Sequence, residues 1–226
     1  MRLEGFNSSS FLISEKYLKF GGYIMQNAVR KPGLSSTKTI AKVGVLSAIA
    51  YVLMFISVPL PIFPSFLKID LSDIPAIFGG MSLGPMAGLA IVIVKNFLQG
   101  ITASTTGGVG EFANIIIGGS YVLIICLCYR KFKSTKSVLT GGLVGIVAMT
   151  IMGCIMNYYI MIPLYATVYG MPMDAIIQMG TVINPKVTDL YTFVIWMIAP
   201  FNIVKAGLMT IVTLPLFKKM EKILSK

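Results

Sequence analysis

A lysine lies deep in the last apolar stretch of the sequence, where a charge is costly. Lys205 is near the middle of residues 192–217, a run of 26 residues that is long enough to cross a bilayer as a helix. A lysine at that depth costs at least ~2.5–3.5 kcal/mol on insertion scales. It lies more than ten residues from either end, so its side chain cannot comfortably reach water by snorkelling. We therefore expect a polar cavity or a ligand inside the protein to meet Lys205.

Two asparagines add amide groups to the same kind of apolar stretch. Asn202 precedes Lys205 by three residues and therefore shares its helix face. Pro200 removes a backbone hydrogen bond from the carbonyl of Trp196, and interrupted helices often line ligand sites in transporters. Asn157 lies near the outer end of the preceding stretch. An amide offers two donors and two acceptors, which suits a heterocycle with mixed edges; the alternative is a structural contact between helices.

Four further polar residues lie near the ends of two neighbouring apolar stretches. Lys95 and Asn96 end one of them, and Glu111 and Asn114 begin the next, where the helix dipole favours an acidic residue. A Lys95–Glu111 ion pair is the simplest interpretation. An outward-facing pocket is the alternative, so Asn96, Glu111 and Asn114 are also candidate substrate contacts.

The first loop between apolar stretches is stiffened by three prolines within residues 59–64. After them, Phe66, Lys68 and Asp70 alternate with apolar residues, which predicts a short extended segment. Aromatic and aliphatic side chains such as Phe66 and Leu67, set over a polar floor, can cover a flat ring. The alternative is a segment that phenylalanines anchor at the membrane interface.

The composition indicates an integral membrane protein. Hydrophobic residues make up 56% of the 226 residues, charged residues make up 12%, and the mean hydropathy is +0.84, whereas soluble domains are about 45–50% apolar and about 25% charged. The chain has no histidine, which removes the commonest general base and most metal-site designs. The G-x-x-x-x-G-K-[ST] phosphate loop is also absent. We expect no enzymatic activity, no metal and no cofactor.

Prolines, glycines and basic loops divide the apolar sequence into six stretches. This pattern predicts an all-α bundle of six transmembrane helices, with a longer amphipathic loop over residues 165–189. The three cysteines all lie in apolar segments and are expected to be buried free thiols. The helices are expected at about residues 39–58, 72–81, 86–100, 111–129, 137–163 and 192–217.

The basic residues are concentrated at places that define a membrane topology. Fifteen of the nineteen lysines and arginines lie in residues 1–42, 130–136 and 218–226. Cytoplasmic loops carry an excess of such residues, so six spans place all three clusters and both termini inside. The net charge of +11 then reflects topology and attraction to anionic lipid, not nucleic-acid binding. We expect a basic cytoplasmic arm (1–37, with Met25 as an alternative start), a six-helix membrane domain that binds substrate (38–220) and a basic cytoplasmic tail (221–226).

Several separate motifs occur in the same order in a known family. Over about residues 38–220 the chain resembles the riboflavin-specific S components of energy-coupling-factor (ECF) transporters. The motifs are FLKIDLSDIPAIFGG at 66–80, GPMAGLAIVIVKNFLQG at 84–100, GGVGEFANIIIG at 107–118, NYYIMIPLY at 157–165 and PFNIVKAG at 200–207.

The resemblance implies a subunit of the bacterial cell membrane that captures riboflavin from outside. It also implies a transmembrane T component and two cytoplasmic ATPases as partners. Asn157, Asn202 and Lys205 match family positions that contact the flavin, and residues 66–68 match the loop that closes over it. Lys68 departs from the small polar residue, such as threonine, expected in some relatives.

The resemblance also implies a docking face on the first helix. The family's small-residue motif, often two alanines four residues apart, contacts the T component. The corresponding residues are Gly44 and Ala48, with Ala41 nearby, and faces of small residues allow close contact between helices.

Two other functions remain open at this point. One is an S component for another vitamin, and the other is a self-sufficient secondary transporter driven by an ion gradient. The scarcity of carboxylates in the apolar stretches counts against the second.

Overall fold

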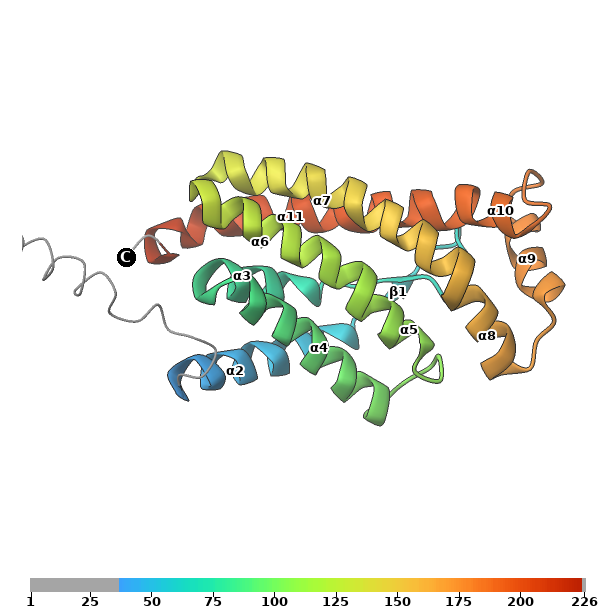
Figure 1. Cartoon of the computed structure of the whole chain (residues 1–226), viewed down its shortest axis with the longest axis horizontal. Helices are drawn as coiled ribbons and strands as arrows, with labels where there is room; N and C mark the ends of the chain where they lie inside the picture. The colour runs from blue at the N-terminus through green and yellow to red at the C-terminus, as the bar shows by residue number, and fades with distance from the viewer. Residues whose placement is uncertain (1–36, 225–226) are drawn as a thin grey trace, which may run out of the picture.

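The computed structural model describes residues 37–224 and consists mainly of helices (Figure 1). The predicted N-terminal arm lies outside the described residues except for its last residue, and so do the last two residues of the predicted tail. The elements are α2 (Thr37–Met54), β1 (Val58–Pro59), β2 (Lys68–Ile69), α3 (Asp73–Leu83), α4 (Pro85–Thr102), α5 (Val109–Ala113), η1 (Asn114–Gly118), α6 (Gly119–Phe132), α7 (Thr135–Met156), η2 (Asn157–Met161), α8 (Ile162–Tyr169), α9 (Met173–Thr181), α10 (Leu190–Phe193), η3 (Val194–Ile198) and α11 (Ala199–Leu224).

Five helical segments are long and apolar enough to cross a membrane. They run over Thr37–Met54, Pro85–Thr102, Val109–Phe132, Thr135–Tyr169 and Leu190–Lys219. The remaining predicted span corresponds to α3, which has only 11 residues and is therefore roughly 16 Å long. The protein is thus a multi-pass helical membrane protein, and a count of six spans stays a prediction.

The arrangement of the helices separates the two ends of the bundle. Figure 1 shows the start of α2, the basic connection between α6 and α7, and the end of α11 at one end, and α8, α9 and α10 at the other. The helix α3 runs back toward the end at which α2 begins. Both ends of the described chain therefore lie on the same side of the bundle.

The α3–α4 hairpin packs closely because of its glycines. Gly84, with φ of +112°, makes the tight turn between the two helices, a conformation that residues with a side chain avoid. A Cβ atom on Gly88 would lie 2.8 Å from the carbonyl oxygen of Ala76, so only glycine allows this approach. The hairpin packs against α2 and α6, and its buried residues share one core with Tyr121, Ile125 and Met209.

The first loop contains the extended segment that the sequence predicts. Lys68 and Ile69 pair antiparallel with Pro59 and Val58, respectively, and Asp70 follows directly. This pairing holds residues 66–70 inward against the bundle.

The segment after the fifth span differs from the prediction. The sequence predicts a loop over residues 165–189, but α8 continues to Tyr169 and α9 forms a further helix. Pro163 does not end the helix because it lies in the first turn of α8, directly after the wider π-helical turn η2. The chain breaks instead at Gly170, which has φ of +61°.

Candidate ligand-binding site

A cavity of about 420 Å³ lies between the first loop, the ends of α4 and α5, and the helices η2 and α11. Its size falls in the ~300–1,000 Å³ range of small-molecule sites. Eight of the nine predicted substrate contacts line it: Phe66, Leu67, Lys68, Glu111, Asn114, Asn157, Asn202 and Lys205. Residues far apart in the sequence therefore meet at one site.

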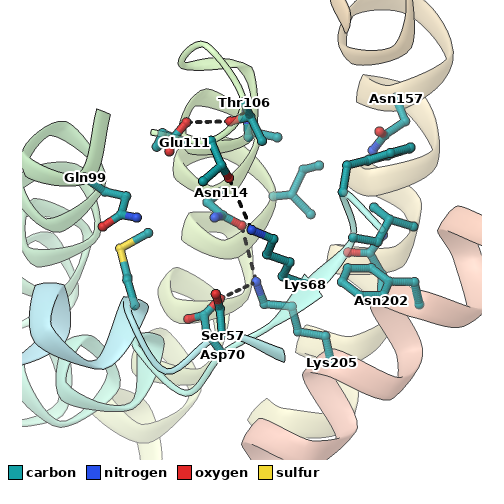
Figure 2. A pocket seen from close by; sticks show the side chains of 18 of the residues that line it. Ser57, Lys68, Asp70, Gln99, Thr106, Glu111, Asn114, Asn157, Asn202 and Lys205 are labelled. Carbon is teal, nitrogen blue, oxygen red and sulfur yellow. Dashed lines mark hydrogen bonds and ion pairs between the residues drawn. The ribbon is translucent and has the colours of Figure 1, made fainter. Parts of the chain in front are cut away.

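Lys205 is held at the wall of this cavity by two oxygen acceptors. Its Nζ lies 3.1 Å from Asp70 Oδ2 and 3.3 Å from Asn114 Oδ1 (Figure 2). The lysine side chain is 4% exposed and that of the aspartate 7%. An ammonium group has three donors, so one donor remains for an acceptor on a ligand. The expected polar environment of Lys205 is present, and its centre is a carboxylate.

Asp70 belongs to a buried cluster of two cations and two anions. Its Oδ1 accepts hydrogen bonds from the backbone N–H of Ser72 at 3.0 Å and from the Ser72 hydroxyl. Lys95 Nζ lies 2.5 Å from both Asp73 Oδ1 and Ser72 Oγ, so Ser72 connects the two ion pairs. Burial alone would raise the pKa of the Asp70 carboxyl, but the positive charges of Lys205 and Lys95 hold this pKa below its ordinary value. The two positive and two negative charges leave the cluster with no net charge.

The prediction of an ion pair between Lys95 and Glu111 is wrong. Lys95 pairs with Asp73, which lies at the start of the adjacent helix α3. Glu111 instead accepts hydrogen bonds from Thr106 Oγ1 at 2.8 Å and from Ser104 Oγ at 3.0 Å. These bonds fix its carboxylate in the wall of the cavity next to the loop 103–108.

Asn96 is the one predicted contact that does not line the cavity. It is 1% exposed, and its Nδ2 donates to the carbonyl oxygen of Val92 at 2.8 Å. It is therefore a buried amide within the helix packing.

Asn157 and Asn202 are both oriented by their own helices. Asn157 Nδ2 donates to Gly153 O at 2.8 Å, and Asn202 Nδ2 donates to Ile198 O at 2.9 Å. Each amide keeps its oxygen and a second N–H. Figure 2 shows both side chains on the same side of the cavity, opposite Gln99.

Three π-helical turns accompany these asparagines. Asn114 begins η1, Asn157 begins η2, and η3 ends four residues before Asn202. In η3 the N–H of Ala199 donates to the carbonyl of Val194, five residues back, directly before Pro200. The interruption predicted from Pro200 is therefore present as a π-helical turn, a feature that is frequent at functional sites.

Aromatic rings and one hydrogen bond cover the cavity on the loop side. The ring of Phe66 lies 5.1 Å from that of Tyr165, and Phe201 contacts Phe63 edge-on at 5.4 Å. Lys68 Nζ donates to Thr105 Oγ1 at 3.2 Å and so connects the first loop to the loop 103–108.

Several cavity residues were not predicted as contacts from the sequence. The clearest signal was the presence of two aspartates, Asp70 and Asp73, near two lysines, Lys95 and Lys205, in otherwise apolar surroundings. Such buried charges need partners. Other missed residues lie on two predicted helices, on a loop and on the misassigned helix α8, and they carried no comparable signal: Gln99, Phe201, Thr105, Thr106 and Tyr165.

The predicted docking face on α2 is open. Ala41, Gly44 and Ala48 are exposed, and a Cβ atom on Gly44 would meet nothing within 4 Å. The face is therefore free to contact another helix, and its partner stays a prediction.

The fold and the cavity together define a membrane-embedded protein that binds a small solute. Residues 38–217 match the family model described as the ECF transporter, substrate-specific component. The chain belongs to this family.

The similar proteins are more specific. The riboflavin transporter RibU of Staphylococcus aureus (strain TCH60) is 33% identical over 200 residues, which cover 88% of this chain and 99% of the relative. The riboflavin transporter FmnP of Bacillus subtilis (strain 168) is 36% identical over 188 residues, covering 81% and 92%. A solved structure of the S component of a bacterial ECF transporter superposes with a TM-score of 0.66 at 33% identity, covering 84% of this chain and 98% of that one.

Proposed function

We propose that this chain captures riboflavin from outside the cell as the substrate-specific subunit of an ECF importer. The observation that carries the proposal is the cavity itself. It combines aromatic cover with two oriented amides and a buried lysine, in a chain similar to two transporters of riboflavin.

The chemistry of the cavity suits a neutral flavin. The isoalloxazine ring is flat and largely apolar, with an imide and carbonyl groups at one edge. Phe66, Tyr165 and Phe201 offer ring surfaces, whereas Asn157 and Asn202 offer the remaining donors and acceptors of their amides. The third donor of the lysine ammonium can reach a carbonyl oxygen. Because the charge of this lysine is already balanced by Asp70, a neutral ligand fits better than a buried phosphate, which would need its own partners.

We infer an orientation in which the basic end of the bundle and both termini face the cytoplasm. The basic connection 130–136 and the end of α11 lie at that end, in agreement with the rule that basic loops stay inside. The α8–α9 end then faces outward. The partners would be a T component, which docks on Gly44 and Ala48, and two ATPases, which supply the phosphate loop that this chain lacks.

A titration of the purified full chain with riboflavin tests the proposal. We expect quenching of flavin fluorescence, one molecule bound per chain, and a flavin absorbance spectrum if ligand is retained during purification. A Kd for riboflavin that is weaker than micromolar would overturn the proposal. Binding of another vitamin in parallel titrations would reassign the substrate and keep the subunit class.

A further inference from the structure

A second cavity of about 270 Å³ adjoins the first. Tyr169, Met171, Ile176 and Met179 line its outer part. These residues belong to α8, to α9 and to the connection between them, at the end of the bundle opposite the basic connection (Figure 1). The second cavity therefore lies beyond the first, toward the side that we infer to face outward.

The two cavities share one wall. Phe66, Lys68, Thr105, Thr106 and Tyr165 line both of them. These residues come from three separate segments: the first loop, the loop 103–108 and α8. Side chains from different segments thus form the partition.

Side-chain contacts join the first loop to the rest of this partition. They include the ring contact between Phe66 and Tyr165 at 5.1 Å and the hydrogen bond from Lys68 Nζ to Thr105 Oγ1 at 3.2 Å. The hydrogen bond is exposed, so water can replace either partner. Passage between the cavities would require the side chains of Phe66 and Lys68 to rotate, and Phe66 would then also leave Phe193, whose ring stacks with it at 6.5 Å.

The lining of the second cavity suits a flat aromatic ring. The rings of Tyr165 and Tyr169 stack at 5.8 Å with an angle of 12° between them, and methionines complete the surface. Aromatic faces and thioether groups favour contact with ring systems. The volume lies just below the ~300 Å³ lower limit of sites for whole ligands, which suits part of a ligand in passage.

We propose that the second cavity is an outer vestibule, in which the flat heterocycle of the substrate binds first and from which it passes between Phe66 and Tyr165 into the inner cavity. This inference rests on the proposed function, since it takes a flavin as the ligand. It assigns a transient binding site to Met171, Ile176 and Met179.

The test measures binding rates of riboflavin to the full chain by stopped-flow fluorescence. Met179→Trp should narrow the vestibule and leave the inner cavity intact. Met171→Trp, on the connection between α8 and α9, should have the same effect. Gln178→Trp is the matched control, because Gln178 is an exposed neighbour on α9 that does not line either cavity. We expect both vestibule variants to lower the association and dissociation rate constants together, by about tenfold, with the Kd changed by less than about threefold. The control keeps the rates of the unaltered chain.

The outcomes separate the two proposals. Unchanged rates in both vestibule variants would overturn the vestibule and leave riboflavin binding intact. A higher Kd caused by faster dissociation alone would also overturn it, because the substituted side chain would then act on the bound ligand. If the unaltered chain does not bind riboflavin, the proposed function itself fails and the vestibule fails with it.

Discussion

At the scale of single residues, Lys205 and Asp70 show how a charge is kept inside a membrane protein. The pair is almost fully buried, and Ser72 connects it to a second pair, Lys95 and Asp73. Removing one member of such a pair usually costs about 3–5 kcal/mol, because the other charge stays buried without compensation. The proposed ligand role of Lys205 must therefore be separated from its structural role.

Lys205→Met should lower both the stability and the riboflavin affinity. The loss of the cation leaves Asp70 unpaired, at a cost of about 3–5 kcal/mol. Lys205→Met combined with Asp70→Asn should recover most of the stability, because the uncompensated charge is gone, but affinity should stay at least about tenfold reduced since the donor to the ligand is missing. Thermal unfolding and riboflavin titration in the same detergent measure the two effects. Full recovery of affinity in the double variant would show that Lys205 acts only by neutralising Asp70.

Asn157→Leu and Asn202→Leu should each weaken riboflavin binding. Each change should remove hydrogen bonds to the ligand and leave ligand groups unsatisfied, at about 1–3 kcal/mol, or roughly fivefold to 150-fold in Kd. Asn96→Leu is the matched control, because Asn96 is equally buried and makes the same bond to the carbonyl four residues earlier, but does not line the cavity. We expect a change below about threefold for the control. An equal loss in all three variants would indicate a structural role for the amides.

At the scale of elements, π-helical turns set the direction of the binding side chains. Pro200 follows η3 and precedes Asn202 and Lys205, so the turn determines where both residues meet the cavity. Pro200→Ala restores a backbone donor and should allow a regular helix, which rotates the two side chains away from the ligand. We expect riboflavin affinity to fall about tenfold with no loss of thermal stability. Pro215→Ala, in the interior of the same helix α11 but outside the cavity, should keep the affinity; a similar fall in both variants would argue against a local effect of η3.

The helix α2 should act as a docking element that is independent of the cavity. Gly44→Leu adds a side chain where no atom lies within 4 Å, so the subunit should fold and bind riboflavin as before. The same side chain should block close helix contact with a T component and reduce its co-purification several-fold. Gly207→Leu, at another helical glycine with open space, is the matched control. Normal assembly of the Gly44 variant would place the docking face elsewhere.

At the scale of the whole molecule, the sequence predicts what depends on local pattern. Hydropathy located the long helices because each must cover the bilayer with apolar residues, and alternation located the extended segment at Lys68. The partner of Lys95 was missed because Asp73 and Glu111 are both close enough in sequence, and only the packing of α3 against α4 decides between them. The helix through Pro163 was missed because a π-helical turn accommodates the proline, and no local sequence pattern predicts that turn.

The distribution of carboxylates predicts that the molecule cannot drive transport by itself. A secondary transporter needs an acidic or other group that exchanges a proton or sodium ion during its cycle. Among residues 37–224, the acidic groups at the site are Asp70 and Asp73, each paired with a lysine, and Glu111, held by two hydroxyls. We therefore expect vesicles that contain only this chain to bind riboflavin but not accumulate it under an imposed proton or sodium gradient. Vesicles that also contain a T component and two ATPases should accumulate it when ATP is supplied, and a variant ATPase that cannot hydrolyse ATP is the control. Gradient-driven accumulation by the single chain would contradict this expectation and show that the protein is a self-sufficient transporter.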